Sequence, residues 1–158
     1  MKRIETKKIT KIAVIAALYA VITLLLTPIS YGQLQVRISE VLTLLPFYLG
    51  GWSAIALWIG CMIANYLGPN GLVDVIFGSL ITLLAGLLTA RAGNKYEAGI
   101  YPVLLNAFGI SLILYLIADL PYWITVLYIG LGQFISVYII GLPLMGVLKK
   151  SLSIFNNN

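Results

Sequence analysis

Long stretches without charge are the feature that most restricts how this chain can fold. Residues 12–36, 41–73, 75–90, 98–118 and 120–148 contain no Asp, Glu, Lys or Arg. Hydrophobic residues make up 61% of the 158 residues and charged residues only 9%, against about 25% charged in ordinary globular chains. One domain of this size cannot hide so much apolar surface from water, so we predict that its solvent is lipid.

The lengths of these stretches predict six membrane-crossing helices. A helix needs about 20 apolar residues to cross roughly 30 Å of hydrocarbon, so the stretch 41–73 is too long for one crossing. Pro46 and the pair Gly50–Gly51 divide it into two short helices. We expect a single all-α membrane domain, residues 1–158, with transmembrane helices near 9–27, 38–50, 52–67, 74–91, 99–118 and 122–148.

Basic residues predict the orientation of these helices. They gather before the first predicted span, between the fourth and fifth, and after the sixth: Lys2, Arg3, Lys7, Lys8, Lys11, Arg91, Lys95, Lys149 and Lys150. Six crossings place all three groups on one side, which the positive-inside rule identifies as the cytoplasm. Both termini are then cytoplasmic. These cytoplasmic basic groups explain the net charge of +5, and no nucleic-acid partner is expected.

The opposite face carries the remaining cation, Arg37, together with Glu40, Asp74 and Asp119. Arg37 and Glu40 lie in the stretch YGQLQVRISE, whose polar residues suit a loop that caps the mouth of the bundle. At spacing i, i+3 they share a helix face, so either an ion pair or a ligand site explains them. Asp74, at the start of the fourth span, fits a helix cap as well as a ligand.

Further polar and aromatic residues complete a candidate pocket that opens outward. Asn65, Asn106 and Gln133 fall inside predicted spans, where amides either join helices or line a cavity. Stacking faces come from Tyr31, Tyr66 and Trp123, although Trp123 also suits an interfacial anchor. Donors, acceptors and aromatic faces in this combination predict a small, flat heterocycle with several N–H groups as ligand.

The first predicted helix carries a stripe of small residues. At 100° per residue, four alanines fall on one face: Ala13, Ala16, Ala17 and Ala20. Small residues four apart allow close approach of another helix in lipid. Packing inside this bundle and docking of a separate membrane protein both remain open from spacing alone.

Several classes of function are disfavoured. The chain has no His and one Cys, Cys61, so we expect no metal site, no cofactor and no enzymatic activity. The phosphate-binding pattern G-x-x-x-x-G-K-[ST] is absent, so the chain does not hydrolyse ATP itself. Channels and proton-driven carriers usually hold ionisable residues at mid-depth, where this sequence predicts none.

Four stretches, LTPISYGQLQVRISEVLTLLPF, NYLGPNGLVDVIFGSLITLLAGLLT, PVLLNA and IGLPL, closely resemble the QueT family of queuosine-precursor transporters. The resemblance covers nearly the whole chain. It implies a bacterial cell-membrane protein that acts as the substrate-binding S component of an energy-coupling-factor (ECF) transporter. Its partners would be a transmembrane coupling protein and two cytoplasmic ATPases, and its ligand a 7-deazaguanine base. The A-x-x-x-A stripe is the usual docking feature of such components.

The resemblance also assigns the pocket or its lid to residues on the family's motif positions: Arg37, Glu40, Asn65, Asp74 and Asn106. The chain departs from the family at Gln133 and Ile113, where glutamates are common. If those glutamates contact the substrate in the family, a cationic aminomethyl precursor would lose its counter-charge here, which favours the neutral precursor or a different related ligand. Two alternatives remain: a self-sufficient secondary carrier or channel, and a membrane anchor or assembly factor without a ligand.

Overall fold

In the computed structural model, residues 2–30, 37–69 and 71–157 are described, and these residues form helices without any strand. The elements in order are α1 (Lys2–Leu25), α2 (Thr27–Ser30), the 3₁₀ helix η1 (Ile38–Leu44), α3 (Leu45–Leu49), α4 (Trp52–Leu67), the π-helical η2 (Asp74–Gly78), α5 (Ser79–Thr89), α6 (Lys95–Ala118), α7 (Tyr122–Phe134), the π-helical η3 (Ile135–Gly141) and α8 (Leu142–Asn157).

The division of the longest charge-free stretch into two helices is confirmed. Helix α4 has the bounds predicted for it, Trp52–Leu67. Before it, Gly50 adopts a φ of 89°, a conformation that residues with a Cβ rarely tolerate. Pro46 lies in the first turn of α3, where its missing N–H is not needed. Glycine and proline therefore mark the ends of helices here, as the sequence indicated.

Three helix boundaries differ clearly from the prediction. Helix α1 begins at Lys2 rather than near residue 9. Helix α6 begins at Lys95 rather than 99, because the Asn94 side chain accepts hydrogen bonds from the backbone N–H groups of Tyr96 and Glu97. This is an N-cap. The last helix continues beyond residue 148 to Asn157. The pair Lys149–Lys150, which the sequence predicts to mark the membrane edge, does not interrupt helical structure, because lysine is a good helix former.

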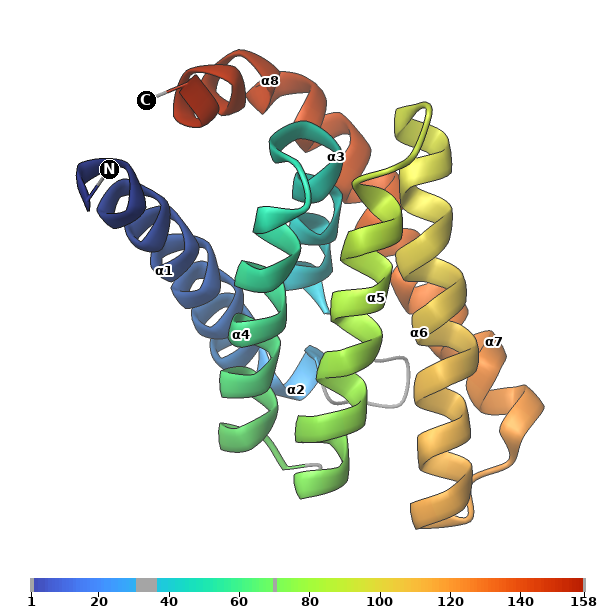
Figure 1. Ribbon diagram of the computed structural model, residues 1–158. Coiled ribbons are helices and arrows are strands. Elements are labelled where there is room, and N and C mark those ends of the chain that lie inside the picture. Colours follow the sequence, from blue (N-terminus) through green and yellow to red (C-terminus); the bar gives the residue numbers. More distant parts are fainter. Residues whose placement is uncertain (1, 31–36, 70, 158) are drawn as a thin grey trace.

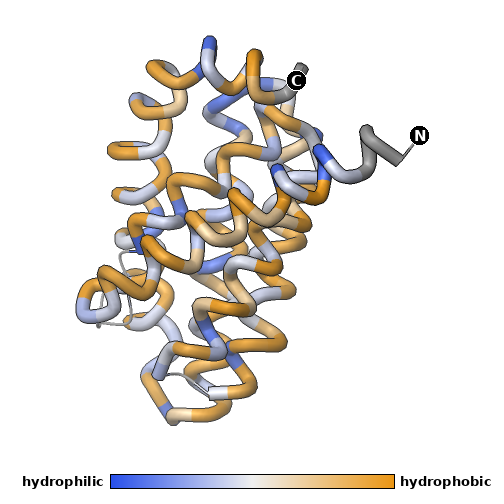
Figure 2. The backbone as a smooth tube through the Cα atoms, turned by 90° about the vertical axis from the view of Figure 1, so that its left-hand side faces the viewer, coloured by the Kyte–Doolittle hydropathy of each residue, from blue (hydrophilic) through white to orange (hydrophobic). Residues whose placement is uncertain are grey.

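The described helices are suited to a membrane. Three continuous helices are long and apolar enough to cross one, namely Thr6–Leu25, Lys95–Ala118 and Tyr122–Phe155. Shorter apolar helices cover 38–49, 52–67 and 74–89. Large hydrophobic side chains are exposed on most of them, and hydrophobic residues mark most helical turns in Figure 2. Such a surface is compatible with lipid and not with water.

The helices form a bundle around a buried central element. Helix α1 packs on α4, α4 on α5, α5 on α6, and α6 on α7, while η1 contacts α1, α4, α5, α6 and η3. Both chain ends and the α5–α6 connection lie at one end of the bundle, and the α4–η2 and α6–α7 connections lie at the other (Figure 1). This arrangement brings η1 and its charged residues into the interior.

Candidate functional site

The element η1 buries the two charged residues that interrupt the apolar sequence. Arg37 caps its start and Glu40 lies in its first turn, with exposed fractions of 5% and 1%. A hydrogen bond of 2.6 Å between the hydroxyls of Thr23 and Ser39 fixes η1 against α1. Buried charges require partners, because an unpaired charge in an apolar interior is strongly destabilising. The partners therefore define the site.

Arg37 pairs with the acid at the start of η2. Its Nη2 donates to Oδ2 of Asp74 at 3.3 Å, and both side chains are almost fully buried. The Nε atom donates to the backbone carbonyl of Ser30 at 3.4 Å. Arg37 thus joins α2, η1 and η2. The acid that forms its ion pair is Asp74 and not Glu40, so the i, i+3 ion pair, one of the two explanations left open by the sequence, is not the arrangement found.

Glu40 has neutral partners from two other helices. The Tyr19 hydroxyl of α1 donates to Oε1 of Glu40. Asn106 Nδ2 of α6 donates to Oε2 at 3.4 Å, a long and therefore weak bond. A carboxylate offers about four lone-pair sites, so Glu40 keeps capacity to accept further hydrogen bonds.

Asp74 is held in place from its other side. Asn65 Nδ2 of α4 donates to the backbone carbonyl of Asp74 at 3.0 Å. One turn later, Gly78 leaves room for the Asp74 carboxylate, since a Cβ at this position would collide with its Oδ1. The backbone of Asp74 is therefore held by an amide, and its carboxylate has room because residue 78 has no side chain.

Gln133, near the end of α7, provides a buried acceptor. Its side chain is only 3% exposed, and its Oε1 has no hydrogen-bond partner among the described residues. A buried polar group without a partner costs about 1–3 kcal/mol. The residue lies just before η3, which packs on η1. A bound molecule with an N–H donor would satisfy this oxygen.

Comparison with known proteins shows which family has such a bundle. Residues 9–150 match the family model described as "QueT transporter". The chain is also 36% identical, over 170 aligned positions, to the "Queuosine precursor transporter QueT" of Lactococcus lactis subsp. cremoris (strain MG1363), covering 98% of this chain and 99% of that protein. The chain belongs to the QueT transporter family. No solved structure matches it.

Membership of the QueT transporter family makes the protein a transporter and not an enzyme. The exposed apolar helices agree with a multi-pass protein of the bacterial membrane. The family also accounts for a polar, buried cluster inside a lipid-facing bundle, since a transporter must offer its solute hydrogen-bonding groups. A membrane anchor without any ligand does not agree with this membership.

The QueT bundle brings together five of the residues expected at the site. They come from η1, α4, η2 and α6 and form two hydrogen-bonded groups: Arg37 with Asp74 and Asn65, and Glu40 with Asn106. The two groups are neighbours on η1, where the backbone N–H of Glu40 donates to the carbonyl of Arg37, and we call them together the buried cluster. Tyr19 links α1 to the Glu40 group. The sequence did not reveal Tyr19, because an aromatic residue in an apolar run normally indicates packing or lipid contact. Its spacing of 21 residues from Glu40 carries no local signal.

Other expected site residues lie apart from the cluster. Trp123 is 71% exposed and packs edge-on against Tyr122, an arrangement that suits an interfacial anchor. Tyr66 is 70% exposed. Asp119 is exposed at the left-handed C-cap of α6. Tyr31 and the remainder of the capping loop, 31–36, lie outside the described residues.

The alanine stripe of this QueT protein divides into two faces. Ala16 and Ala20 are 3% and 4% exposed, and a Cβ on Gly60 of α4 would lie only 2.6 Å from the backbone oxygen of Ala16. These two alanines therefore serve packing inside the bundle. Ala13 and Ala17 are exposed. The docking of another protein on the stripe stays a prediction, for which Ala13 and Ala17 are the exposed residues.

Proposed function

We propose that this QueT family member is the substrate-capture subunit of an ATP-driven ECF importer. In this proposal it binds a queuosine precursor, a 7-deazaguanine base, from outside the cell. The six apolar segments cross the membrane, with both termini in the cytoplasm. The relative from Lactococcus lactis is named a queuosine precursor transporter, and the aligned region covers almost all of both chains. The similarity that supports the proposed substrate therefore extends over the whole bundle.

The observation that carries the proposal is the buried hydrogen-bonding cluster around Glu40. Charges in a membrane bundle are costly and usually functional. Here one guanidinium and two carboxylates are buried together with two amides. A purely structural ion pair would need only Arg37 and Asp74. Glu40 is left as a carboxylate with neutral partners and spare acceptor sites, which favours a ligand that brings N–H donors.

A deazaguanine edge matches these groups in number and kind. Its neighbouring ring N–H and amino group present two donors that one carboxylate accepts as a pair. We assign this role to Glu40. The ring carbonyl requires a donor, and Asn106 Nδ2 already lies 3.4 Å from Oε2 of Glu40. The base would replace this long hydrogen bond with two shorter ones. Gln133 Oε1 would accept from another N–H group of the ligand.

The neutral residues at two positions favour the neutral nitrile precursor over the cationic aminomethyl precursor. Gln133 is buried, and Ile113 is partly buried. Neither offers the negative charge that an ammonium group would need in a low-dielectric site. Calorimetry with the purified protein and each precursor tests this preference. Clearly tighter binding of the aminomethyl precursor would contradict it.

Energy coupling requires partner proteins, because the chain contains no nucleotide-binding motif. We assign the docking of a transmembrane coupling protein to the exposed pair Ala13 and Ala17. Two cytoplasmic ATPases would complete the importer. Toppling of the bundle in the bilayer would then carry the site inward.

Uptake in proteoliposomes tests the proposal against the alternative of a self-sufficient carrier. We expect labelled precursor to accumulate only when the coupling protein, both ATPases and internal ATP are present. The chain alone should bind precursor without accumulating it. Accumulation by the chain alone, driven by an ion gradient, would establish a secondary carrier. Absence of binding to any deazaguanine base would contradict the proposed substrate.

A further inference from the structure

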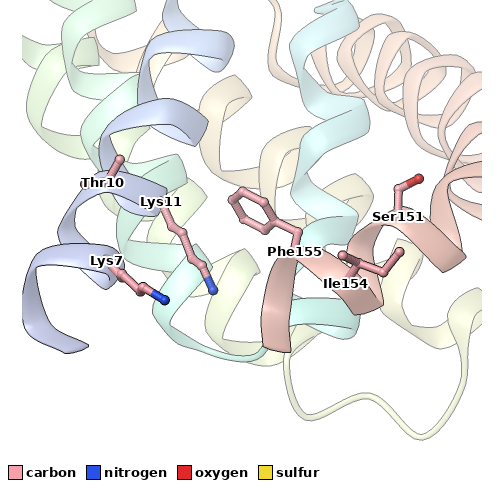
Figure 3. A pocket seen from close by; sticks show the side chains of 6 residues that line it. All are labelled: Lys7, Thr10, Lys11, Ser151, Ile154 and Phe155. Carbon is pink, nitrogen blue, oxygen red and sulfur yellow. The ribbon is translucent and has the colours of Figure 1, made fainter. Parts of the chain in front are cut away.

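A groove outside the buried cluster lies between the two ends of the chain. It has a volume of about 550 Å³, within the range of roughly 300–1,000 Å³ that is typical of small-molecule sites. The first turns of α1 form one wall and the end of α8 forms the other. Figure 3 shows the six residues that line it: Lys7, Thr10, Lys11, Ser151, Ile154 and Phe155.

The groove combines positive charge with apolar surface. Lys7 and Lys11 are four residues apart and therefore share one face of α1. The Nζ of Lys11 lies 5.3 Å from the ring centre of Phe155, so the ammonium is held at the groove by an aromatic face. Ile154 is 54% exposed beside it. None of the six lining residues is acidic. Such a surface matches an anionic amphiphile.

The position of the groove relative to the apolar spans fixes its depth in the bilayer. Its α1 residues lie in the first turns of the span Thr6–Leu25, and its α8 residues end the span Tyr122–Phe155. The second span has 34 residues and includes the π-helical η3, more than the about 20 residues that cross the hydrocarbon. Its last part, α8, runs across the end of the bundle (Figure 1). With α7 and η3 in the hydrocarbon, the groove falls at the depth of the lipid headgroups.

We infer that this groove binds one anionic phospholipid of the cytoplasmic leaflet. The two ammonium groups and the hydroxyl of Ser151 would hold the phosphate, while Ile154 and Phe155 contact the upper part of an acyl chain. Basic pockets between helix ends recognise anionic headgroups in this way. The inference depends on the proposed orientation, but it does not depend on the identity of the transported solute.

Native mass spectrometry of the delipidated protein tests the inference, with phosphatidylglycerol and phosphatidylcholine of identical acyl chains as probes. We expect the wild-type chain to retain one phosphatidylglycerol with clear preference. The double variant Lys7→Gln/Lys11→Gln should lose about thirtyfold in affinity, because each lysine near an anionic surface contributes roughly a fivefold factor. Ile154→Asn should weaken the lipid without weakening inorganic phosphate. Precursor binding, measured separately, should be unchanged in all variants.

The matched control is Lys149→Gln/Lys150→Gln, which removes the same charge from exposed residues that do not line the groove. Its affinity for phosphatidylglycerol should fall far less. An equal loss in both double variants would show general charge attraction and overturn the site. Equal retention of the two lipids by the wild type would also overturn it. Equally tight binding of soluble glycerol phosphate would assign the groove to a free phosphate compound instead.

Discussion

The carboxylate of Glu40 is placed differently from the other buried acid. The carboxylate of Asp74 is neutralised by Arg37, and its backbone carbonyl accepts a hydrogen bond from Asn65. Glu40 instead accepts from a tyrosine hydroxyl and from a distant amide. The first acid thus has a structural partner of opposite charge, and the second does not. Substitution of each residue should therefore affect different properties of the protein.

Replacement of Glu40 by glutamine should weaken precursor binding more than it lowers stability. The change keeps the shape but removes the charge and one acceptor. Hydrogen bonds to charged groups contribute about 1.5–3 kcal/mol, so we expect affinity to fall roughly 10- to 100-fold. Titration calorimetry measures this. Glu97→Gln is the control, since Glu97 bonds to Gly93 and Tyr101 in the first turn of α6; unaltered affinity in Glu40→Gln would remove Glu40 from the site.

Replacement of Asp74 by asparagine should destabilise the ligand-free protein. It removes the carboxylate that pairs with the buried Arg37 guanidinium, and loss of one partner of a buried ion pair typically costs about 3–5 kcal/mol. We expect a clear fall in the thermal unfolding midpoint in lipid nanodiscs. Asp119→Asn, on an exposed C-cap, should change the midpoint little. Equal midpoints for Asp74→Asn and the wild type would show that Arg37 finds sufficient partners elsewhere.

Sequence reasoning located the charged and amide residues but not their pairing. Rare charges in an apolar chain are conspicuous, so Arg37, Glu40 and Asp74 could be identified as a set. Which acid meets the arginine depends on how η1 and η2 pack, and no spacing rule encodes it. Tyr19 was missed for the same reason. Trp123 was included because aromatic rings suit both stacking and interfaces, and its exposure now favours the interface.

At the level of elements, helix α1 connects the exterior of the bundle with the site. Ala16 and Ala20 pack on α4, Tyr19 reaches Glu40, and Ala13 with Ala17 faces outward. The periodicity of the sequence predicted a smooth alanine face, but it could not show that the bundle covers half of it. The bounds of α4, in contrast, followed from the glycines before it, whereas the charged residues in α1, α6 and α8 do not mark the ends of these helices. Glycine and proline determine the backbone conformation of their own turn, so their effect can be predicted without knowing the packing of the bundle.

Helix α1 should lose its docking function when the exposed alanine face is made bulky. We expect Ala17→Trp to retain precursor binding but to abolish ATP-dependent uptake, because close helix approach requires small residues. Uptake assays and calorimetry on the same preparation separate the two effects. Leu18→Trp is the control, since Leu18 is exposed on a different side of α1. Unchanged uptake in Ala17→Trp would place docking elsewhere.

The contact of α1 with α4 should depend on Gly60. A Cβ there would approach the Ala16 oxygen to 2.6 Å and the Tyr19 Cβ to 2.9 Å, which forces α1 outward. We expect Gly60→Ala to destabilise the protein by about 1–3 kcal/mol and to weaken binding, as Tyr19 moves from Glu40. Gly146→Ala meets no atom within 4 Å and should be neutral or slightly stabilising. Equal stability of both variants would contradict tight α1–α4 packing.

At the level of the whole molecule, the arrangement of connections agrees with the distribution of charge. Both termini and the α5–α6 connection lie at one end of the bundle (Figure 1), and these segments hold nine of the ten basic residues. The remaining one, Arg37, is buried in the ion pair with Asp74. Positive charge at one end only is what a cytoplasmic face requires.

This topology predicts which positions an impermeant thiol reagent reaches. Cys61 is fully buried and should not react. The labelling of each introduced cysteine can therefore be measured without a signal from Cys61. We expect Pro69→Cys and Leu120→Cys to react in intact cells, and Gly93→Cys and Ser151→Cys only after permeabilisation. Labelling of Gly93→Cys but not of Ser151→Cys from outside would require an odd number of crossings between the two positions. The basic groups of the two termini and of the α5–α6 connection could then not share one side, and the groove between α1 and α8 would not face the anionic inner leaflet.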